Sequence, residues 1–508
     1  MSKEQELKYL VVVFDGLRPD HVVDARMPNL SSLKRAGCWL TRHRAAFPTE
    51  TRVNAASLAT GAPCAEHGIV GNQFIDIGHD PSRLVNGGDL DSLRTLDAGA
   101  GRTAMTAAPF SELLAARRLG MISVGSQSSG SWGLSHPSAD TECHTGYWCA
   151  DPTRFTGNPT VAAVADGFPQ FTAKPPAVES CGRVADVFLK LMKSEPLPPV
   201  SLVWFGEPDV SYHKFGLGSP EAEEALLQAD RNFGRLLDWW DTYRHEQNLQ
   251  LIVISDHGHI TIGEKISVKE TLHRAGFSVG ESLETGNAVA VSGQRISDIW
   301  VRDGDPALAT AVLDVLRDQP WFGLCFSAGR EGHFGKIPGT FSHESVFAGH
   351  RRAPDLRVTF IDDDEENAFG VPGCGYSDGR HPAGDSMHGG LHPRELWSVG
   401  LYAGSAFSRK HESHTPSSIT DVAPTILHGL GIESPASMTG RVLREILGPD
   451  DTPLSSVEAC PVSLTAGTRQ TTIHRTRVGK HVYLDGAEYR DAEGGIEPST
   501  IARGGKSV

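Results

Sequence analysis

The sequence has no surplus of positive charge. Its 47 Lys and Arg residues are outnumbered by 62 Asp and Glu residues, which gives a formal net charge of −15. Nucleic-acid backbones and anionic membrane surfaces attract basic proteins, so an acidic chain is a poor match for either. We therefore expect no nucleic-acid partner and no membrane partner.

Long apolar runs are also missing, and none approaches the roughly twenty residues that a bilayer-spanning helix needs. The charged segment 1–7 leads directly into a short apolar run and does not have the pattern of a secretory signal peptide. The eight cysteines lack paired metal-site spacing, so we expect reduced thiols, with Cys143 and Cys149 as the pair that could join. These features predict a cytoplasmic protein.

Three short apolar runs, residues 9–14, 200–205 and 251–254, have the pattern of buried parallel strands. A carboxylate follows each of them. The three carboxylates are Asp15, Asp209 and Asp256. Because the carboxyl ends of parallel strands meet at one edge of a sheet, we expect these side chains to converge on one crevice.

The chain of 508 residues is longer than one compact core usually holds. We expect an α/β fold with a mostly parallel central sheet between layers of helices. Residues 1–259 and 388–450 would form this core, residues 260–387 an inserted α+β cap, and residues 451–508 a β-rich C-terminal appendage. Within the core we expect 73–102 to be an irregular surface excursion and 126–170 to be a long functional loop.

Thr51 lies at the junction of a proline-containing loop and a helix of small residues. A hydroxyl there would lie near the free N–H groups of the helix N-terminus, where anions bind. A lone threonine before a helix is usually only an N-cap. Its context in the chain favours a phosphate-attacking nucleophile.

Six oxygen and imidazole ligands recur at the predicted sheet edge. Asp209 and His213 are four residues apart and share one side of a helical turn. The full set is Asp15, Asp209, His213, Asp256, His257 and His388. Any one of them has an ordinary structural explanation, but together they suit a pair of divalent ions, zinc above all.

These motifs resemble those of the alkaline phosphatase superfamily, specifically its nucleotide pyrophosphatase/phosphodiesterase branch, which is related to phosphonoacetate hydrolase. The matching motifs are the Asp-Gly after the first strand, the threonine-centred loop, Asp-x-x-x-His, Asp-His-Gly and the late His-Gly. The resemblance covers most of residues 8–260 and 388–445. It implies an alkaline-phosphatase-like core and a metal-dependent phosphodiesterase-type hydrolase.

The resemblance also implies a role for each residue. Asp209, His213 and His388 would hold one ion, and Asp15, Asp256, His257 and the Thr51 oxygen would hold the other. Thr51 would attack the phosphorus of a phosphodiester or pyrophosphate and form a phosphothreonine, and Asn72 would donate to a phosphoryl oxygen. A phosphonate hydrolase or phosphomonoesterase on the same two metals is the alternative, and a catalytically silent metal-binding protein is the non-enzymatic one.

The chain departs from the family pattern in two places. Arg52 follows Thr51, where the nucleotide phosphodiesterases commonly carry an aromatic residue that stacks on the base, so Arg52 could instead bind a phosphate or carboxylate oxygen. Residues 126–128 are Ser-Gln-Ser, where phosphonoacetate hydrolases carry lysines. We expect His259 and His392 to be outer groups rather than a third metal site. The sequence leaves both small phosphoesters and phosphonates open as substrates. It also leaves open whether the β appendage forms an oligomer interface.

Overall fold

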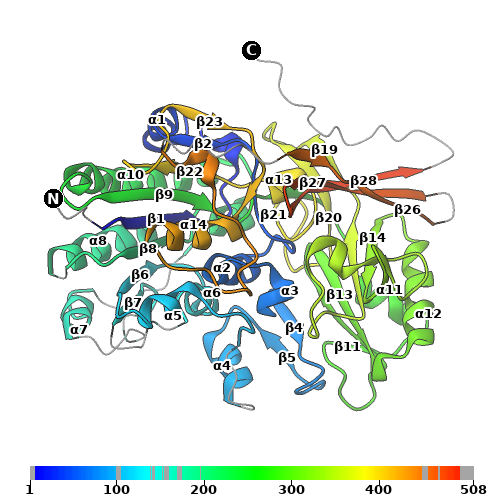
Figure 1. Ribbon diagram of the computed structural model, residues 1–508. Helices are drawn as coiled ribbons and strands as arrows, with labels where there is room; N and C mark the ends of the chain where they lie inside the picture. Colours follow the sequence, from blue (N-terminus) through cyan, green and yellow to red (C-terminus); the bar gives the residue numbers. More distant parts are fainter. Residues whose placement is uncertain are drawn as a thin grey trace.

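Figure 1 shows a large central sheet with helices on both of its faces, a second sheet beside it, and C-terminal strands that run along that second sheet. The computed structural model describes residues 6–98, 104–137, 139, 143–151, 153, 159–168, 174–194, 196–448, 456–466 and 469–491. The first residues of the predicted appendage, 451–455, and its end, 492–508, lie outside this part of the chain. None of the eight cysteines, all of which are described, forms a disulfide, in line with the predicted reduced thiols.

The central sheet has eight strands in the order β23-β2-β22-β9-β1-β8-β6-β7. They are β1 (Lys8–Phe14), β2 (Cys38–Leu40), β6 (Met121–Gly125), β7 (His144–Trp148), β8 (Val200–Phe205), β9 (Leu249–Ser255), β22 (Gly400–Ala403) and β23 (His411–Ser413). All neighbours from β9 to β7 are parallel, whereas β22 runs antiparallel to β9 and to β2. The predicted mostly parallel sheet is therefore confirmed.

Two cores cover the two faces of this sheet. Side chains alternate along a strand, so the odd-numbered residues 9–13 of β1 enter one core and the even-numbered residues 10–14 enter the other. The first core includes α2 (Thr51–Thr60), α5 (Phe110–Ala115) and α14 (Val422–Gly429). The second includes α1 (Pro28–Ala36), α8 (Val178–Ser194) and α10 (Pro220–Tyr243). Burial on both faces explains why these strands are continuous apolar runs.

Two segments of the core differ from the prediction. Within 73–98, β4 (Gln73–Ile75) pairs with β5 (Leu84–Asn86), and α4 (Leu90–Ala98) follows. Within 126–168, β7 forms the edge of the central sheet, between α6 (Ser129–Ser135) and α7 (Pro159–Ala165). Expecting irregular structure in both was wrong, because strands of three to five residues are too short to show a periodic pattern.

The remaining elements form three larger sheets, one two-stranded sheet and several short pieces. The second eight-stranded sheet, with α11 (Val268–Arg274) and α12 (Pro306–Arg317), contains β11 (Val279–Gly280), β12 (Val289–Gly293), β13 (Ile296–Val301), β14 (Phe322–Ser327), β15 (Gly329–Glu331), β16 (Phe334–Gly335), β17 (Phe341–Ser342) and β18 (Leu356–Phe360). A smaller sheet contains β10 (Ile260–Lys265), β19 (Asp362–Glu366), β20 (Pro372–Ser377) and β21 (Ser386–Met387), and the C-terminal sheet contains β25 (Val457–Ala459), β26 (Val462–Ala466), β27 (Arg469–Val478) and β28 (His481–Asp491). The short pieces include α3 (Cys64–His67), α13 (Pro393–Leu396), β3 (His43–Arg44) and β24 (Ser417–Ser418). The exact division into domains stays a prediction.

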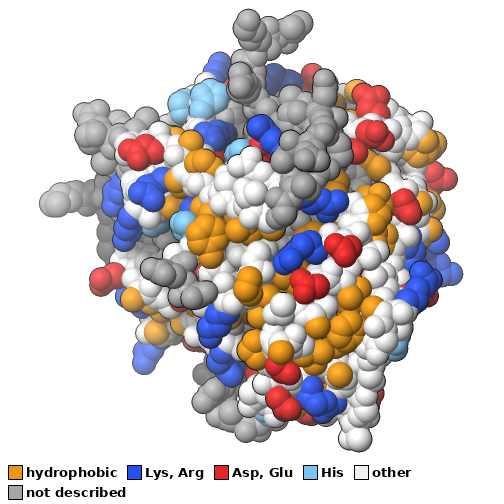
Figure 2. All heavy atoms as spheres, turned by 90° about the vertical axis from the view of Figure 1, so that its right-hand side faces the viewer, with side chains coloured by type: hydrophobic (Ala, Val, Ile, Leu, Met, Phe, Trp, Pro, Cys, Tyr) orange, Lys and Arg blue, Asp and Glu red, His pale blue; other side chains and the backbone are white. Residues whose placement is uncertain are grey.

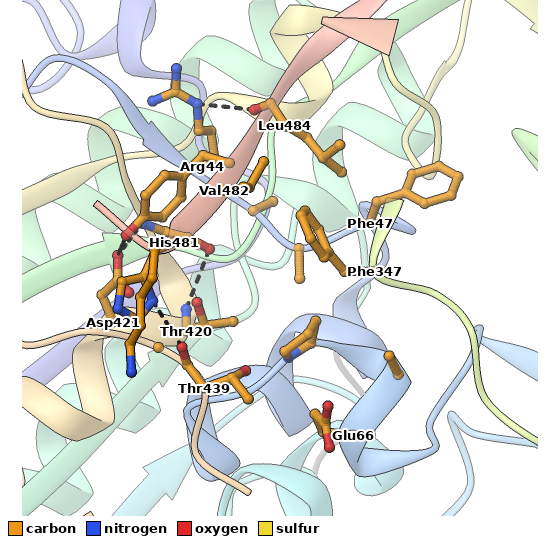
Figure 3. A pocket seen from close by; sticks show the side chains of 18 residues that line it. Arg44, Phe47, Glu66, Phe347, Thr420, Asp421, Thr439, His481, Val482 and Leu484 are labelled. Atoms are coloured by element: carbon orange, nitrogen blue, oxygen red, sulfur yellow. Dashed lines mark hydrogen bonds between the residues drawn. The ribbon is translucent and has the colours of Figure 1, made fainter. Parts of the chain in front are cut away.

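A cavity of about 260 Å³ lies where the core, the second sheet and the C-terminal strands meet. Figure 3 shows Phe47 and Phe347 on one side of it, with His481 and Thr439 on the other. None of the predicted metal ligands lines it. The candidate site lies elsewhere, at the edge of the central sheet.

The surface carries charges of both signs. On the face that Figure 2 shows, acidic and basic side chains are interspersed among apolar ones, so the net negative charge is not gathered there. Among the described residues, no helix is both long and apolar enough to cross a bilayer.

Asp378 gives the second sheet a testable pH dependence. It accepts hydrogen bonds from the Ser297 hydroxyl at 2.7 Å and the Val268 N–H at 3.1 Å, and burial raises its pKa to about 6. A raised folded-state pKa stabilises the fold at low pH, and this contribution is lost as the pH rises through 6. As the pH rises from 4 to 7, we therefore expect the free energy of unfolding of the Asp378→Asn variant to increase by about 2 kcal/mol relative to that of the unsubstituted protein.

Unfolding of the two proteins at several pH values checks this prediction. The exposed Asp318→Asn, at the end of α12, controls for the loss of one negative charge. A difference in stability between the Asp378→Asn variant and the unsubstituted protein that stays constant from pH 4 to 7 would contradict the expectation.

Candidate metal centre

Three neighbouring strands of the central sheet deliver the three predicted carboxylates to one edge. Asp15 follows β1, Asp256 follows β9, and Asp209 begins α9 (Asp209–Phe215) just after β8. Asp15 and Asp256 are buried, and Asp209 is partly buried. The convergence follows from the parallel register of β8, β1 and β9, which brings their carboxyl ends level with one another.

One cluster surrounds Asp209. Its Oδ1 lies 3.2 Å from His213 Nε2, one helical turn away, and 3.4 Å from His388 Nε2. His213 and His388 approach each other to 3.2 Å between their Nε2 atoms. His259 Nε2 is closer still to the Asp209 oxygen, at 2.9 Å.

A second cluster surrounds His257. Its Nε2 lies 3.1 Å from the Thr51 hydroxyl oxygen, 3.3 Å from Asp256 Oδ2 and 3.6 Å from Asp15 Oδ1. The rings of His257 and His388 stack at a centroid distance of 3.6 Å, so the two clusters adjoin. The structure thus brings together all the side chains predicted as metal ligands, from segments up to 373 residues apart in the sequence.

Thr51 is the first residue of α2, and Glu50 is the N-cap. Small side chains such as Ala55 and Ala59 allow α2 to be buried on nearly all sides, and Gly61 ends the helix in the left-handed conformation with φ +59°. The Thr51 side chain is itself buried, with an exposed fraction of 4%. A hydroxyl held at a rigid helix N-terminus is well placed beside an anionic group.

The loop before Thr51 is tied to the segment that carries His388. The His388 Nδ1–H donates to the Thr49 carbonyl at 2.8 Å, and the Gly389 N–H donates to the Thr49 hydroxyl at 3.0 Å. That hydroxyl donates in turn to the Gly390 carbonyl at 2.9 Å. These bonds fix the position of the nucleophile relative to one of the predicted ligands.

Asn72 lies beside the start of α2. Its Oδ1 accepts from the Arg52 backbone N–H at 3.4 Å, and its own backbone N–H donates to the buried Glu50 carboxylate. Because the amide oxygen is engaged by the helix, the NH₂ end of Asn72 remains to donate to a ligand oxygen. Burial and the nearby Asp298 raise the pKa of Glu50 to about 7.

The chemistry of the donors fits divalent metal ions. His213, His257 and His388 each use Nδ1–H toward a backbone carbonyl, at 2.8, 3.1 and 2.8 Å. In the neutral ring this leaves a lone pair on each Nε2, and these lone pairs point at one another and at carboxylates. Imidazole nitrogen and carboxylate oxygen are the ligand mixture that zinc takes in proteins.

The electrostatics of Asp15 and Asp256 also favour a bound cation beside them. Burial, together with the negative charges of Asp256 and Asp209, raises the pKa of Asp15 well above its usual value. Asp15 Oδ1 and Asp256 Oδ2 are buried without a hydrogen-bond partner. Such atoms are costly unless a cation compensates them, so the residues present suit the two predicted ions.

The sequence did not reveal three further contacts. His259, expected to be an outer or solvent-exposed group, is buried against Asp209, and Trp204 Nε1 donates to Asp15 Oδ2 at 3.1 Å. Glu50 is buried, and its carboxylate accepts from the Asn72 N–H. His392 is the N-cap of α13, where its Nδ1 accepts from the Arg394 N–H. The only signal in the sequence was that each lies next to, or within a few residues of, a predicted ligand.

Known proteins resemble the chain in sequence over about half of its length. A venom phosphodiesterase of Naja atra is 26% identical over 249 residues, which is 48% of this chain and 25% of the venom protein. Ectonucleotide pyrophosphatase/phosphodiesterase family member 7 of Rattus norvegicus is 26% identical over 275 residues, which is 54% of this chain and 55% of the rat protein. The matched stretch therefore spans about half, or less, of each relative.

Solved structures support the fold. Murine ectonucleotide pyrophosphatase/phosphodiesterase 5 superposes with a TM-score of 0.60 and 18% identity, covering 87% of this chain and 100% of the murine chain. Its likeness places the central sheet among alkaline-phosphatase-like cores. The model of the family described as "Type I phosphodiesterase / nucleotide pyrophosphatase" matches residues 9–319. This range includes seven of the eight predicted site residues, all but His388, and the whole Thr51 helix. By this match the chain belongs to the type I phosphodiesterase / nucleotide pyrophosphatase family, within the alkaline phosphatase superfamily.

Proposed function

We propose that this protein is a two-metal hydrolase that cleaves a phosphodiester or pyrophosphate bond through a phosphothreonine intermediate on Thr51. The observation that carries the proposal is the position of the Thr51 hydroxyl, 3.1 Å from His257 Nε2 and within the same cluster as Asp15 and Asp256. Family membership supports the same reaction class.

Two groups of residues would hold the ions. One group is Asp209, His213 and His388, and the other is Asp15, Asp256, His257 and the Thr51 oxygen. When bound, divalent ions would lower the pKa of the Thr51 hydroxyl and stabilise negative charge on the phosphoryl oxygens. His259, which contacts Asp209, is an additional candidate for the first group.

The residues of the chain then divide the reaction between them. The hydroxyl proton of Thr51 passes to solvent, its oxygen forms a bond to phosphorus, and the leaving oxygen departs with the electron pair of the bond that breaks. Asn72 and the N-terminus of α2 would donate hydrogen bonds to the phosphoryl oxygens. Water attacking the phosphothreonine breaks the new bond and regenerates the Thr51 hydroxyl.

The names of related proteins support a proposal about the class of substrate. A solved structure contains an inactive threonine-to-alanine variant of the murine protein in complex with AMP, and other relatives are named venom phosphodiesterases. We propose small phosphoesters as substrates of this chain on that basis. Phosphonate or phosphomonoester hydrolysis on the same residues is the alternative, although Ser126, where a lysine would suit phosphonoacetate, accepts a hydrogen bond from the Gly206 N–H instead.

Metal dependence tests the proposal directly. We expect the protein to bind about two zinc ions per chain and to hydrolyse bis(p-nitrophenyl) phosphate, and we expect a chelator to remove at least about 99% of the activity until zinc is restored. His388→Ala should lower the bound zinc to about one ion. The exposed His411→Ala is the matched control and should keep both ions.

Parallel assays with a phosphomonoester and phosphonoacetate separate the alternatives. Faster turnover of either of these than of the diester would replace the proposed reaction with the alternative one. Full activity in the presence of chelator, with no zinc bound, would overturn both. The cytoplasmic location, the absence of nucleic-acid and membrane partners, and the oligomeric state stay predictions.

A further inference from the structure

Arg52, next to the proposed nucleophile, has no ion-pair partner within the part of the chain that the structure describes. It lies in the first turn of α2, directly after Thr51, and is partly buried. Its Nε is buried without a hydrogen-bond partner, and its guanidinium has no carboxylate partner among the described residues. A buried donor that lacks an acceptor costs stability unless a ligand supplies one.

Other buried arginines of this chain are paired. Five of them each contact a carboxylate: Arg18 with Asp20, Arg44 with Asp485, Arg295 with Asp362, Arg352 with Asp76, and Arg357 with Asp298. The buried Arg475 has no carboxylate partner, but it donates to the carbonyls of Cys460 and Ser345. Arg52 differs from these arginines because its guanidinium has no hydrogen bond to a described residue, and it lies beside the candidate site.

The backbone leaves a slot for the Arg52 side chain. A Cβ on Gly88 would lie 2.9 Å from Arg52 Nη2, and one on Gly87 would lie 3.4 Å from its Cγ. Hydrogen bonds fix both glycines, because Gly87 N–H donates to the Asn72 carbonyl and Gly130 N–H donates to the Gly88 carbonyl. Gly130 allows this close approach, since a Cβ there would lie 1.9 Å from the Gly87 oxygen. The side chain is thus held along Gly87 and Gly88, beside Asn72.

Arg52 follows Thr51 in the first turn of α2, and its backbone N–H donates to Asn72 Oδ1 at 3.4 Å. The Arg52 side chain therefore starts beside the two residues that the proposed function assigns to the phosphoryl group.

We propose that Arg52 binds a second anionic group, a carboxylate or phosphate, on the part of the substrate that stays attached to phosphorus during the first step. This rests on the proposed function. In an in-line displacement the leaving group departs on the side opposite the Thr51 oxygen, whereas Arg52 is the neighbour of Thr51 and lies along the Gly87–Gly88 slot. Arginine is suited to carboxylate and phosphate groups because its planar fork can donate two parallel hydrogen bonds.

Three p-nitrophenyl phosphodiesters test this assignment. Their second alcohol is 3-hydroxypropionate, its methyl ester, or 2-hydroxyethyl phosphate, so that the leaving group is the same in all three. We expect the zinc-loaded protein to favour the charged esters over the neutral one by about tenfold to a hundredfold in kcat/KM, mainly through KM. The better of the two charged esters identifies whether the second anion is a carboxylate or a phosphate.

Arg52→Gln should remove this preference and leave turnover of the neutral ester within about threefold, whereas Arg52→Lys should retain part of it. Arg83→Gln, an exposed arginine of the segment between β4 and β5, is the matched charge control and should keep the full preference. Equal losses on all three esters in Arg52→Gln would overturn the assignment, because Arg52 would then serve the scissile phosphoryl group. A zinc-loaded protein without any preference would overturn it as well.

A binding measurement separates this inference from the proposed function. We expect the zinc-loaded protein to bind 3-phosphonopropionate at least about tenfold more tightly than its carboxyl methyl ester, and Arg52→Gln to bind both equally. If none of the diesters is cleaved but this difference is found, the proposed function fails and the assignment of Arg52 stands. Equal binding of the two ligands by the unsubstituted protein would overturn the assignment.

Discussion

Thr51→Ala is expected to abolish phosphodiester hydrolysis, with a loss in kcat of at least about a thousandfold. The alanine removes the only oxygen of the side chain that lies 3.1 Å from His257 Nε2 and can form the bond to phosphorus. It leaves the histidines and aspartates of both clusters in place. Release of p-nitrophenol from bis(p-nitrophenyl) phosphate, with the zinc content measured on the same sample, gives the result.

Two variants make the Thr51 experiment specific. Thr60→Ala, at the other end of α2, removes a threonine whose hydroxyl donates to the Ala56 carbonyl, and it should keep activity. Thr51→Ser keeps a nucleophilic oxygen and should retain part of the turnover. A folded, zinc-loaded Thr51→Ala protein with more than about a tenth of the normal kcat would exclude the phosphothreonine route.

Arg357→Met is expected to have the largest effect on stability, a loss of about 3–5 kcal/mol in the free energy of unfolding. Arg357 in β18 is fully buried and donates two hydrogen bonds of 2.6 Å to Asp298 in β13. It also donates to the Val70 carbonyl of the core at 2.6 Å. Removing the guanidinium leaves the buried Asp298 carboxylate uncompensated, and it removes a link between the second sheet and the segment that leads to Asn72.

Denaturant or thermal unfolding measures this loss. The double variant Asp298→Asn with Arg357→Met should lose less than the sum of the two single changes, because the unpaired charge is removed as well. The exposed pair Arg35–Asp24, with a separation of 2.7 Å, gives the comparison, and Arg35→Met should cost no more than about 1 kcal/mol. Similar losses of stability for Arg357→Met and Arg35→Met would show that the buried Arg357–Asp298 pair does not stabilise the contact between the second sheet and the segment that leads to Asn72.

The central sheet was predictable because its strands are buried on both faces. Such strands are continuous apolar runs, and β8 was predicted with its observed bounds of 200–205. The edge strand β7, His144–Trp148, was missed because it has only five residues and contains no apolar run. Its place in the sheet depends on β6, which pairs with it in parallel, and on packing that a local pattern does not contain.

Much of the candidate site could likewise be predicted, since parallel strands bring their carboxyl ends together whatever the rest of the fold does. Asp15, Asp209 and Asp256 were placed correctly at one edge by this rule. The contact of His259 with Asp209, and that of Trp204 with Asp15, could not be predicted, because they depend on rotamers and distances of the folded core. The unpaired state of Arg52 is a property of the same kind.

The bonds between Thr49 and the segment 388–390 have a consequence for synthesis of the chain. The proposed nucleophile lies in its first tenth, whereas His388 and the two glycines that hold Thr49 come more than 330 residues later. A nascent polypeptide on the ribosome would therefore carry an incomplete centre until translation has passed residue 390 and that segment has left the exit tunnel. The proposed hydrolysis should therefore begin only late in translation, even though most of the central sheet is available earlier.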